Sequence, residues 1–408
     1  MNSFRMLKRS GSHCPQLLGA LVLLLGGVWV APAAAQFLPN ESLVSANPGL
    51  IDFEFSQSRG RVAWTDPQGN LWLARVNRST GAFEPVTGRG QLVATGAVAK
   101  SNMFKWNGPE WLAMASGDQL IYSYYLPGQP HDALHTRMAV AVQNKNGNWV
   151  SQPVSPELPR MSHVASQDKD DQNPHIRYLD PDLNHYWRNV LDPSSETRLW
   201  FLPPSNRAWR FASGARALVY SLPVNGVSQV FSYQLDSGTI KQMTFDDGGK
   251  DTGRTVPWMW QAPEFDGDYV LATVVDDSEL RIYRKLTVAG VTQWRPIYSA
   301  SVPHGRTIGS PEWFVYNGKS YLSLAVFVVP NEFPSEVWIS NIEAADPLMR
   351  RITDTTLFRV RNDPEVFITE QGPFVYYNRY DPGISPEHPL CNECSEGVYR
   401  ADTGLWGR

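Results

Sequence analysis

Cysteine, long apolar runs and an excess of charge of either sign are all scarce in this chain of 408 residues. Three cysteines are too few for a small fold held together by several disulfides. After residue 35 no stretch approaches the ~18 to 20 apolar residues that a membrane-spanning helix needs, so we expect no membrane span. Lysine and arginine number 36 against 40 acidic residues and form no basic stripe, which argues against nucleic acid as a partner.

Several catalytic motifs and helical periodicity are also missing. There is no Gly-x-Ser-x-Gly nucleophile elbow, phosphate-binding glycine loop or dinucleotide-binding fingerprint. Hydrolases that use a nucleophile elbow and nucleotide-binding enzymes are therefore disfavoured. Glycine and proline number 31 each and punctuate short runs rich in aromatic and β-branched residues. The chain is therefore predicted to be all-β, with frequent turns.

The first 35 residues have the layout of a secretory signal peptide. Arg5, Lys8 and Arg9 precede an apolar run over residues 17–30, and Ala33–Ala35 stand before Gln36. We therefore expect residues 1–35 to be removed and the mature protein to be exported, to the periplasm or outside the cell.

Two cysteines remain in the mature chain, in the segment Cys391-Asn-Glu-Cys394. In an oxidising compartment this spacing favours a small local disulfide between Cys391 and Cys394. A redox or zinc site is disfavoured, because the pair lies in a proline-rich loop and no second ligand pair is found.

One stretch, residues 310–342, reads as a complete small β-sheet unit. A short run ends at an Asn317-Gly318 turn, a second run covers residues 320–329, and residues 336–342 alternate as a third strand. Similar units recur along the mature chain. They begin near residues 52, 108, 173, 208, 262, 310 and 363.

Repeated sheets of this size cannot bury both faces alone, but stacking them radially covers those faces. The spacing of the copies is compatible with the ~40 to 50 residues of a propeller blade. We predict that residues 36–408 form one β-propeller domain of seven blades, with six or five as alternatives. The copy near residue 173 is short and polar, and the count falls to six if it is only a loop.

The aligned copies share a column of mostly acidic residues. Its members are Glu54, Glu110, His175, Arg210, Glu264, Glu312 and Glu365. If the column lies on the first strand of each blade, it forms a ring around the central channel. Converging carboxyl groups would raise one another's pKa values unless a cation neutralised them. The alternative is structural, with each side chain accepting hydrogen bonds from the neighbouring blade as a repeated fastening.

The units at residues 311–326 and 363–381 resemble the repeats of secreted five-bladed arabinanase and xylosidase-type glycosidases. The alternation at residues 59–76 resembles TolB-like periplasmic propellers. The resemblance implies a propeller fold and, for the glycosidases, a trio of carboxylates on first strands. Asp363, in Asp-Pro-Glu, matches the opening aspartate of that pattern.

Three chemistries are open for the column. Two carboxylates could act as general acid and general base on a glycosidic bond. Arg210 with His175 or Tyr186 could act as a polysaccharide lyase on an acidic sugar. A divalent cation such as calcium could sit in the channel instead.

We expect the ligand to be a carbohydrate bound at the channel mouth, aided by aromatic residues of two long connections at 153–173 and 246–260. The alternative from another class is a non-catalytic propeller of the cell envelope that binds a protein partner.

Overall fold

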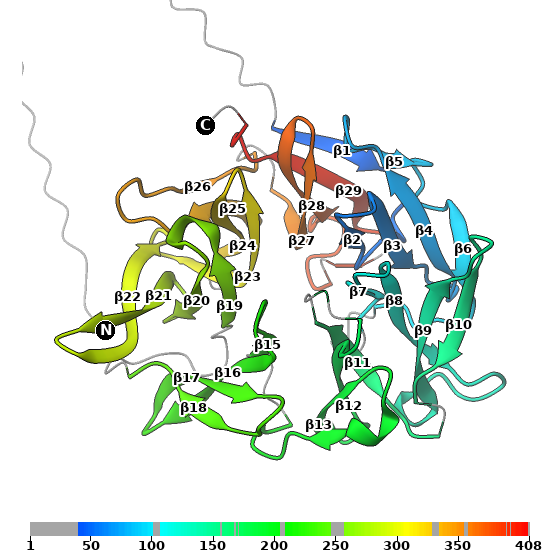
Figure 1. Ribbon diagram of the computed structural model, residues 1–408. Helices are drawn as coiled ribbons and strands as arrows, with labels where there is room; N and C mark the ends of the chain where they lie inside the picture. Colours follow the sequence, from blue (N-terminus) through cyan, green and yellow to red (C-terminus); the bar gives the residue numbers. More distant parts are fainter. Residues whose placement is uncertain are drawn as a thin grey trace, which may run out of the picture. The chain divides into compact units, whose positions relative to one another are not determined.

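The strands of the protein lie in seven small antiparallel sheets arranged in a ring (Figure 1). The structure, a computed structural model, describes residues 40–100, 107–155, 157–166, 169, 171–204, 209–245, 257–328, 334–354, 358–388, 390, 391 and 393–406. The signal peptide predicted for residues 1–35 and most of the connection expected at 246–260 lie outside this set. The predicted all-β propeller with seven blades is confirmed.

Within each sheet the strands pair in order from the first to the last. The first four sheets are β2 (Glu54–Ser56), β3 (Arg61–Thr65), β4 (Leu71–Val76) and β5 (Phe83–Glu84), with β6 (Gln91–Ala94) also on β4; β7 (Glu110–Leu112), β8 (Gln119–Tyr125), β9 (Thr136–Gln143) and β10 (Trp149–Pro153); β11 (Met161–Ala165), β12 (His175–Leu179), β13 (His185–Asn189) and β14 (Thr197–Arg198); β15 (Trp209–Phe211), β16 (Ala217–Val224), β17 (Val227–Gln234) and β18 (Ile240–Gln242). The other three are β19 (Trp258–Ala262), β20 (Asp268–Val275), β21 (Glu279–Val288) and β22 (Val291–Ser301); β23 (Arg306–Tyr316), β24 (Lys319–Val328), β25 (Ser335–Asn341) and β26 (Met349–Arg351); β27 (Val360–Thr369), β28 (Gly372–Tyr380), β29 (Ser395–Asp402) and β1 (Glu41–Ser45).

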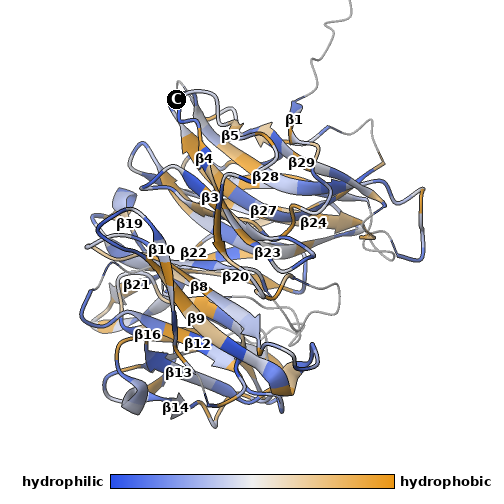
Figure 2. Cartoon of the chain, turned by 90° about the vertical axis from the view of Figure 1, so that its right-hand side faces the viewer, coloured by the Kyte–Doolittle hydropathy of each residue, from blue (hydrophilic) through white to orange (hydrophobic). Residues whose placement is uncertain are grey.

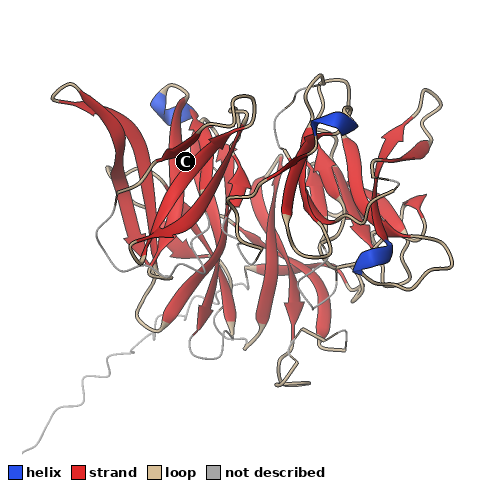
Figure 3. Ribbon diagram, turned by 90° about the horizontal axis from the view of Figure 1, so that it is seen from below, coloured by secondary structure: helices blue, strands red, loops and turns tan. Residues whose placement is uncertain are grey.

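Helix is almost absent from the described part of the chain (Figure 3). It is limited there to three short 3-10 turns, Ala133–His135, Pro193–Ser195 and Pro263–Phe265. None of the described helices is long and apolar enough to cross a membrane.

The core lies between neighbouring sheets. Strand β28 is buried along its whole length and β24 along most of it, because each sheet has another sheet against both faces. Hydrophobic residues accordingly run along the strands in Figure 2. A typical contact between blades is the stack of Trp260 on Trp313, with ring centroids 5.5 Å apart.

The Asn317-Gly318 turn predicted from the sequence joins β23 to β24. Both residues have left-handed backbone torsions, with φ of 50° and 72°, and Tyr316 pairs directly with Lys319. These are the torsions that a two-residue hairpin loop requires, and they explain why Asn-Gly stands at this position.

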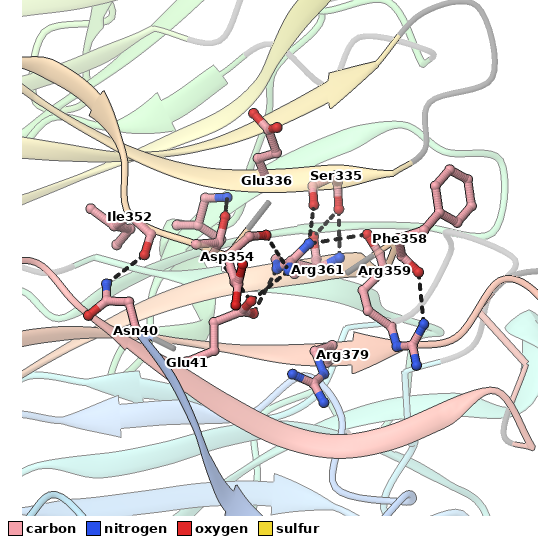
Figure 4. Close-up of polar contacts among 12 residues, drawn as sticks. Asn40, Glu41, Ser335, Glu336, Ile352, Asp354, Phe358, Arg359, Arg361 and Arg379 are labelled. Carbon is pink, nitrogen blue, oxygen red and sulfur yellow. Dashed lines mark hydrogen bonds and ion pairs between the residues drawn. The ribbon is translucent and has the colours of Figure 1, made fainter. Parts of the chain in front are cut away.

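The ring is closed by the first described strand. Strand β1 pairs with β29, so the two ends of the propeller chain share one sheet. Glu41 at the start of β1 accepts two hydrogen bonds from the buried guanidinium of Arg361, at 2.8 and 2.6 Å (Figure 4). Tyr377 donates to the same carboxylate at 2.6 Å, and Arg361 donates to the carbonyl of Ser335 on the neighbouring sheet at 2.9 Å. This buried ion pair fastens the last two sheets to the closing strand.

Two units begin at a different point from the aligned motif. The third sheet starts with β11, within the stretch that the sequence suggested to be a long connection, and His175 opens its second strand. In the sheet that begins with β19, Glu264 falls in the 3-10 turn that follows this first strand. The short third unit is nevertheless a complete sheet, which is why the count stays at seven.

Candidate functional site

A cavity of about 820 Å³ lies where the first strands of the sheets converge. Its charged lining consists of Glu54, Lys100, Glu110, Arg177, Arg210, Glu312 and Glu365, and its aromatic lining of Phe55, Trp209, Phe211, Trp258, Trp313 and Phe314. Five of the seven residues of the aligned column therefore meet at one cavity.

The four glutamates of this lining lie where a strand begins or directly after a shift in strand register. Glu54 and Glu110 open β2 and β7. In β23 and β27 the register shifts just before Glu312 and Glu365, at residues 308–311 and 362–365. Bulges of this kind reorient the side chain that follows, and here that side chain borders the cavity.

Burial keeps these carboxyl groups protonated at unusually high pH. It raises the pKa of Glu110 to about 8, with further repulsion from Asp52 and Glu312. It also raises the pKa of Glu312 to about 7, where attraction to Arg210 limits the rise. The pKa values of Glu54 and Glu365 lie well above the usual range, because both half-buried groups are desolvated and repelled by neighbouring carboxylates.

Arg210 supplies positive charge among these acids. It lies on β15, where its guanidinium packs 4.9 Å from the ring centre of Trp258 and donates to the carbonyl of Trp209 at 2.9 Å. Its charge attracts Glu312 and Glu110, so it favours the ionised form of both.

A second charged group stands beside the glutamates. Lys100 bridges Asp363, at 2.7 Å, and Asp52, and the backbone N–H of Gly108 also donates to Asp52. Burial opposes ionisation of both aspartates, but attraction to Lys100 leaves the pKa of Asp363 below its usual value. The pKa of Asp52 is raised to about 6 by burial, with repulsion from Asp363. Asp363 is therefore the more readily ionised of the two aspartates.

The opposite wall is basic and aromatic. The guanidinium of Arg177 lies 3.4 Å from the ring centre of Trp209 and contacts the Nδ1 atom of His185. Burial, with repulsion from Arg177, lowers the pKa of His185 to about 3, so its imidazole is neutral. The cavity thus has carboxyl groups on one side and guanidinium groups with tryptophans on the other.

Two residues predicted for lyase chemistry are not in this lining. His175 is buried on β12, where its Nδ1 atom bonds to the carbonyl of Asn173 at 3.0 Å and its ring packs on Phe211. Tyr186 stacks on Tyr178 at 6.1 Å and packs under Arg160. The arrangement proposed for a lyase, with Arg210 beside His175 or Tyr186, is not assembled at the cavity.

Glu264 also lies outside the lining, and it performs the fastening that the structural interpretation of the column described. Its carboxylate accepts hydrogen bonds from the backbone N–H and the hydroxyl of Ser320, at 2.8 and 2.9 Å, on the next sheet. Trp260 donates to the same hydroxyl at 3.0 Å. The column therefore divides, with one member joining two blades and others lining the cavity.

The remaining predictions concern the metal, the disulfide and the connections. The described residues contain no group of three or more His, Cys, Asp or Glu arranged to hold a metal ion. The predicted disulfide between Cys391 and Cys394 is confirmed. Of the connection expected at 153–173, Ser162 and Val164 line the cavity, but they do so from strand β11.

Sequence reasoning missed Asp52, Lys100 and Arg177. An available signal for Asp52 was the repeat of Asp-x-Glu, since Asp52 precedes Glu54 as Asp363 precedes Glu365. Both aspartates also share a left-handed backbone, with φ of 51° and 58°.

Comparison with solved structures finds matches over most of the chain at low sequence identity. It is similar to Sqt1 of Saccharomyces cerevisiae, with 10% identity, a TM-score of 0.47 and coverage of 85% of this chain and 82% of that one. It is also similar to the periplasmic gluconolactonase PpgL of Pseudomonas aeruginosa, with 15% identity, a TM-score of 0.42 and coverage of 74% and 84%. A Trypanosoma rangeli sialidase solved with sialic acid matches at 9% identity and a TM-score of 0.43, over 86% of this chain and 60% of that one. No protein-family model matches the chain, and no curated protein matches it significantly in sequence.

Proposed function

We propose that the protein is an exported enzyme that binds a carbohydrate in the central cavity and hydrolyses a glycosidic bond there. The observation that carries this proposal is that Glu110 and Glu312, from two different sheets, border one cavity together with several tryptophans. Glu110, with a pKa of about 8, holds its proton near neutral pH, whereas Glu312, with a pKa of about 7 beside Arg210, begins to lose its proton there. Glycoside hydrolysis uses one protonated and one ionised carboxyl group.

In this mechanism Glu110 gives its proton to the oxygen of the leaving sugar. Asn107 donates a hydrogen bond to Glu110 at 3.3 Å and orients the carboxyl group. Glu312 supplies the ionised carboxylate, either as base toward a water molecule or as nucleophile at the anomeric carbon. Inversion or retention at that carbon distinguishes the two roles.

The aromatic wall supports a sugar as the ligand. Trp209, Trp258 and Trp313 border the same cavity as the glutamates, and flat apolar rings pack against the C–H faces of sugar rings. Export, supported by the disulfide and by the predicted signal peptide, is compatible with a polysaccharide substrate outside the cytoplasm.

The test is a screen of the mature protein against neutral, acidic and amino polysaccharides, following reducing ends and unsaturated products together. We expect reducing ends without unsaturated products. Glu110→Gln should hydrolyse ordinary substrates about 100-fold more slowly or worse. Its rate should fall much less on sugars with an activated aryl leaving group, because that group leaves without being protonated. Glu343→Gln, which changes an ion pair with Lys319 outside the cavity, is the matched control. Unsaturated products, or silence on every substrate, would overturn the proposal.

A further inference from the structure

The described lining of the cavity has more acids than bases. Four glutamates border it, and Asp52 and Asp363 stand directly behind Lys100. The bases that border it are Lys100, Arg177 and Arg210, and Lys100 is already paired with the two aspartates. If every group were ionised, the cavity would carry an excess of negative charge, which a cationic ligand would neutralise.

Two buried polar atoms of the lining point to a ligand independently of this charge. The indole N–H of Trp258 has no hydrogen-bond partner among the described residues, although the side chain is only 5% exposed and borders the cavity. The side-chain oxygen of Asn107 is also buried without a described partner, while its amide nitrogen donates to Glu110. Buried polar groups are nearly always satisfied, so a donor and an acceptor here suit a ligand that offers both.

The acceptor lies on the acidic side and the donor on the aromatic side. The amide nitrogen of Asn107 donates to Glu110, so its free side-chain oxygen lies among the glutamates and can accept from an N–H group. Trp258 packs against Arg210, so its indole N–H and this guanidinium together attract oxygen atoms. A sugar with an ammonium group and hydroxyl groups carries both kinds of atom on one small ring.

We propose that the glycan bound in the cavity bears free amino groups, as an oligomer of glucosamine does. This inference rests on the proposed function, and it names the substrate class of the same site. The ammonium groups face Glu54 and Glu365, with the side-chain oxygen of Asn107 as a further acceptor, while hydroxyl oxygens accept from the indole N–H of Trp258. An ammonium group stabilises the ionised forms of the glutamates beside it, whereas a neutral glycan offers them no charge partner and a glycan carboxylate favours their protonated forms.

A consequence is that binding releases protons. Without ligand, burial and repulsion from neighbouring carboxylates keep Glu54 and Glu365 protonated near neutral pH. An ammonium group beside them favours their ionised forms and lowers their pKa values, so protons leave as the ligand enters. A neutral oligomer of the same length releases none.

The experiment is isothermal titration calorimetry of the mature protein at about pH 6.5, where the free glutamates still hold their protons. The probes are a β-1,4 glucosamine tetramer, its fully N-acetylated form and the matching glucose tetramer. Each is titrated in two buffers of different ionisation enthalpy. We expect the glucosamine tetramer to bind about tenfold tighter or more, which is ~1.4 kcal/mol, with a buffer-dependent enthalpy that shows proton release.

Three variants test the contacts. Glu54→Gln with Glu365→Gln should reduce the preference for the amine and the number of protons released. Trp258→Phe keeps an aromatic ring but lacks the N–H, and should weaken binding of the amine several-fold. Glu343→Gln should behave like the wild type, since its residue pairs with Lys319 away from the cavity.

The outcomes separate the two proposals. Equal or tighter binding of the glucose or N-acetylated tetramer, or binding of the amine without proton release, overturns the amino-sugar assignment and leaves the hydrolase proposal standing. If a folded protein binds and cleaves none of the three, and none of the wider polysaccharide panel, both proposals fail.

Discussion

Replacing Glu110 by glutamine should remove part of the pH dependence of stability. In the unfolded chain the carboxyl group has its ordinary pKa of 4.5, whereas in the folded protein burial raises the pKa to about 8. Between these values the folded state holds a proton that the unfolded state has lost. Folding therefore takes up a proton, and the free energy of unfolding falls as pH rises through this window.

The magnitude follows from proton linkage. One proton of difference changes the free energy of unfolding by about 1.4 kcal/mol per pH unit. From about pH 5.5 to about pH 7.0 the limit for one carboxyl group is therefore ~2 kcal/mol. Glu110 borders a cavity that water enters, so we expect about 1 to 2 kcal/mol in practice.

The assay is urea unfolding of wild type, Glu110→Gln and Glu343→Gln at several pH values in that range. The wild type should lose stability as pH rises, because Glu110 and the three other cavity glutamates all have raised pKa values. Over this pH range the free energy of unfolding of Glu110→Gln should fall by about 1 to 2 kcal/mol less than that of the wild type. The variant should be the more stable of the two proteins near neutral pH. Glu343→Gln should follow the wild type. If the stability of Glu110→Gln fell with pH as steeply as that of the wild type, the claim that Glu110 holds its proton near neutral pH would be refuted.

The same contacts lead to three other expected outcomes. The pH profile of kcat/KM should be bell-shaped with its optimum between about 7 and about 8. Activity should fall below this range because Glu312 becomes protonated, and above it because Glu110 loses its proton. An optimum near pH 5 would contradict these roles. Glu41→Gln should lower the free energy of unfolding by about 3 to 5 kcal/mol, because it leaves the charge of Arg361 buried without its carboxylate; a loss below about 1 kcal/mol in chemical unfolding would show that this ion pair contributes little to stability. Glu264→Ala should cost about 1 to 3 kcal/mol through the lost bonds to Ser320, without changing oligosaccharide affinity in calorimetry; a large affinity loss in a folded variant would place Glu264 at the site.

The sequence predicted the sheets well because hairpin chemistry is local. Asn317-Gly318 defines its turn through two left-handed residues, and the adjacent runs need only neighbouring sheets to cover them. The glutamates of the cavity could be found for a similar reason, since a repeated position in a repeated sheet points in the same direction.

The misplaced column members have a different cause. Pro174-His175 and Pro263-Glu264 match the motif in letters, but in these units a complete strand precedes the motif. Proline followed by a polar and an apolar residue suits a second strand or a 3-10 turn as well as a first strand. Only the pairing of β11 with β12 and of β19 with β20 decides which strand is the first.

Lys100 could not have been found from its local sequence. It follows β6 in a connection between blades, and its importance comes from meeting Asp52 and Asp363, which lie 48 and 263 residues away in the chain. Such a contact depends on closure of the ring. The same holds for the raised pKa values, which arise from burial among side chains of four different sheets.

The most direct test of the central claim is a crystal structure of Glu110→Gln with a bound oligosaccharide. The account predicts sugar rings in the central cavity against Trp209 and Trp313, with a glycosidic oxygen within hydrogen-bond reach of residue 110 and an anomeric carbon facing Glu312. Clear density for the sugar only on the outer surface of the blades, with the central cavity filled by water alone, would contradict it.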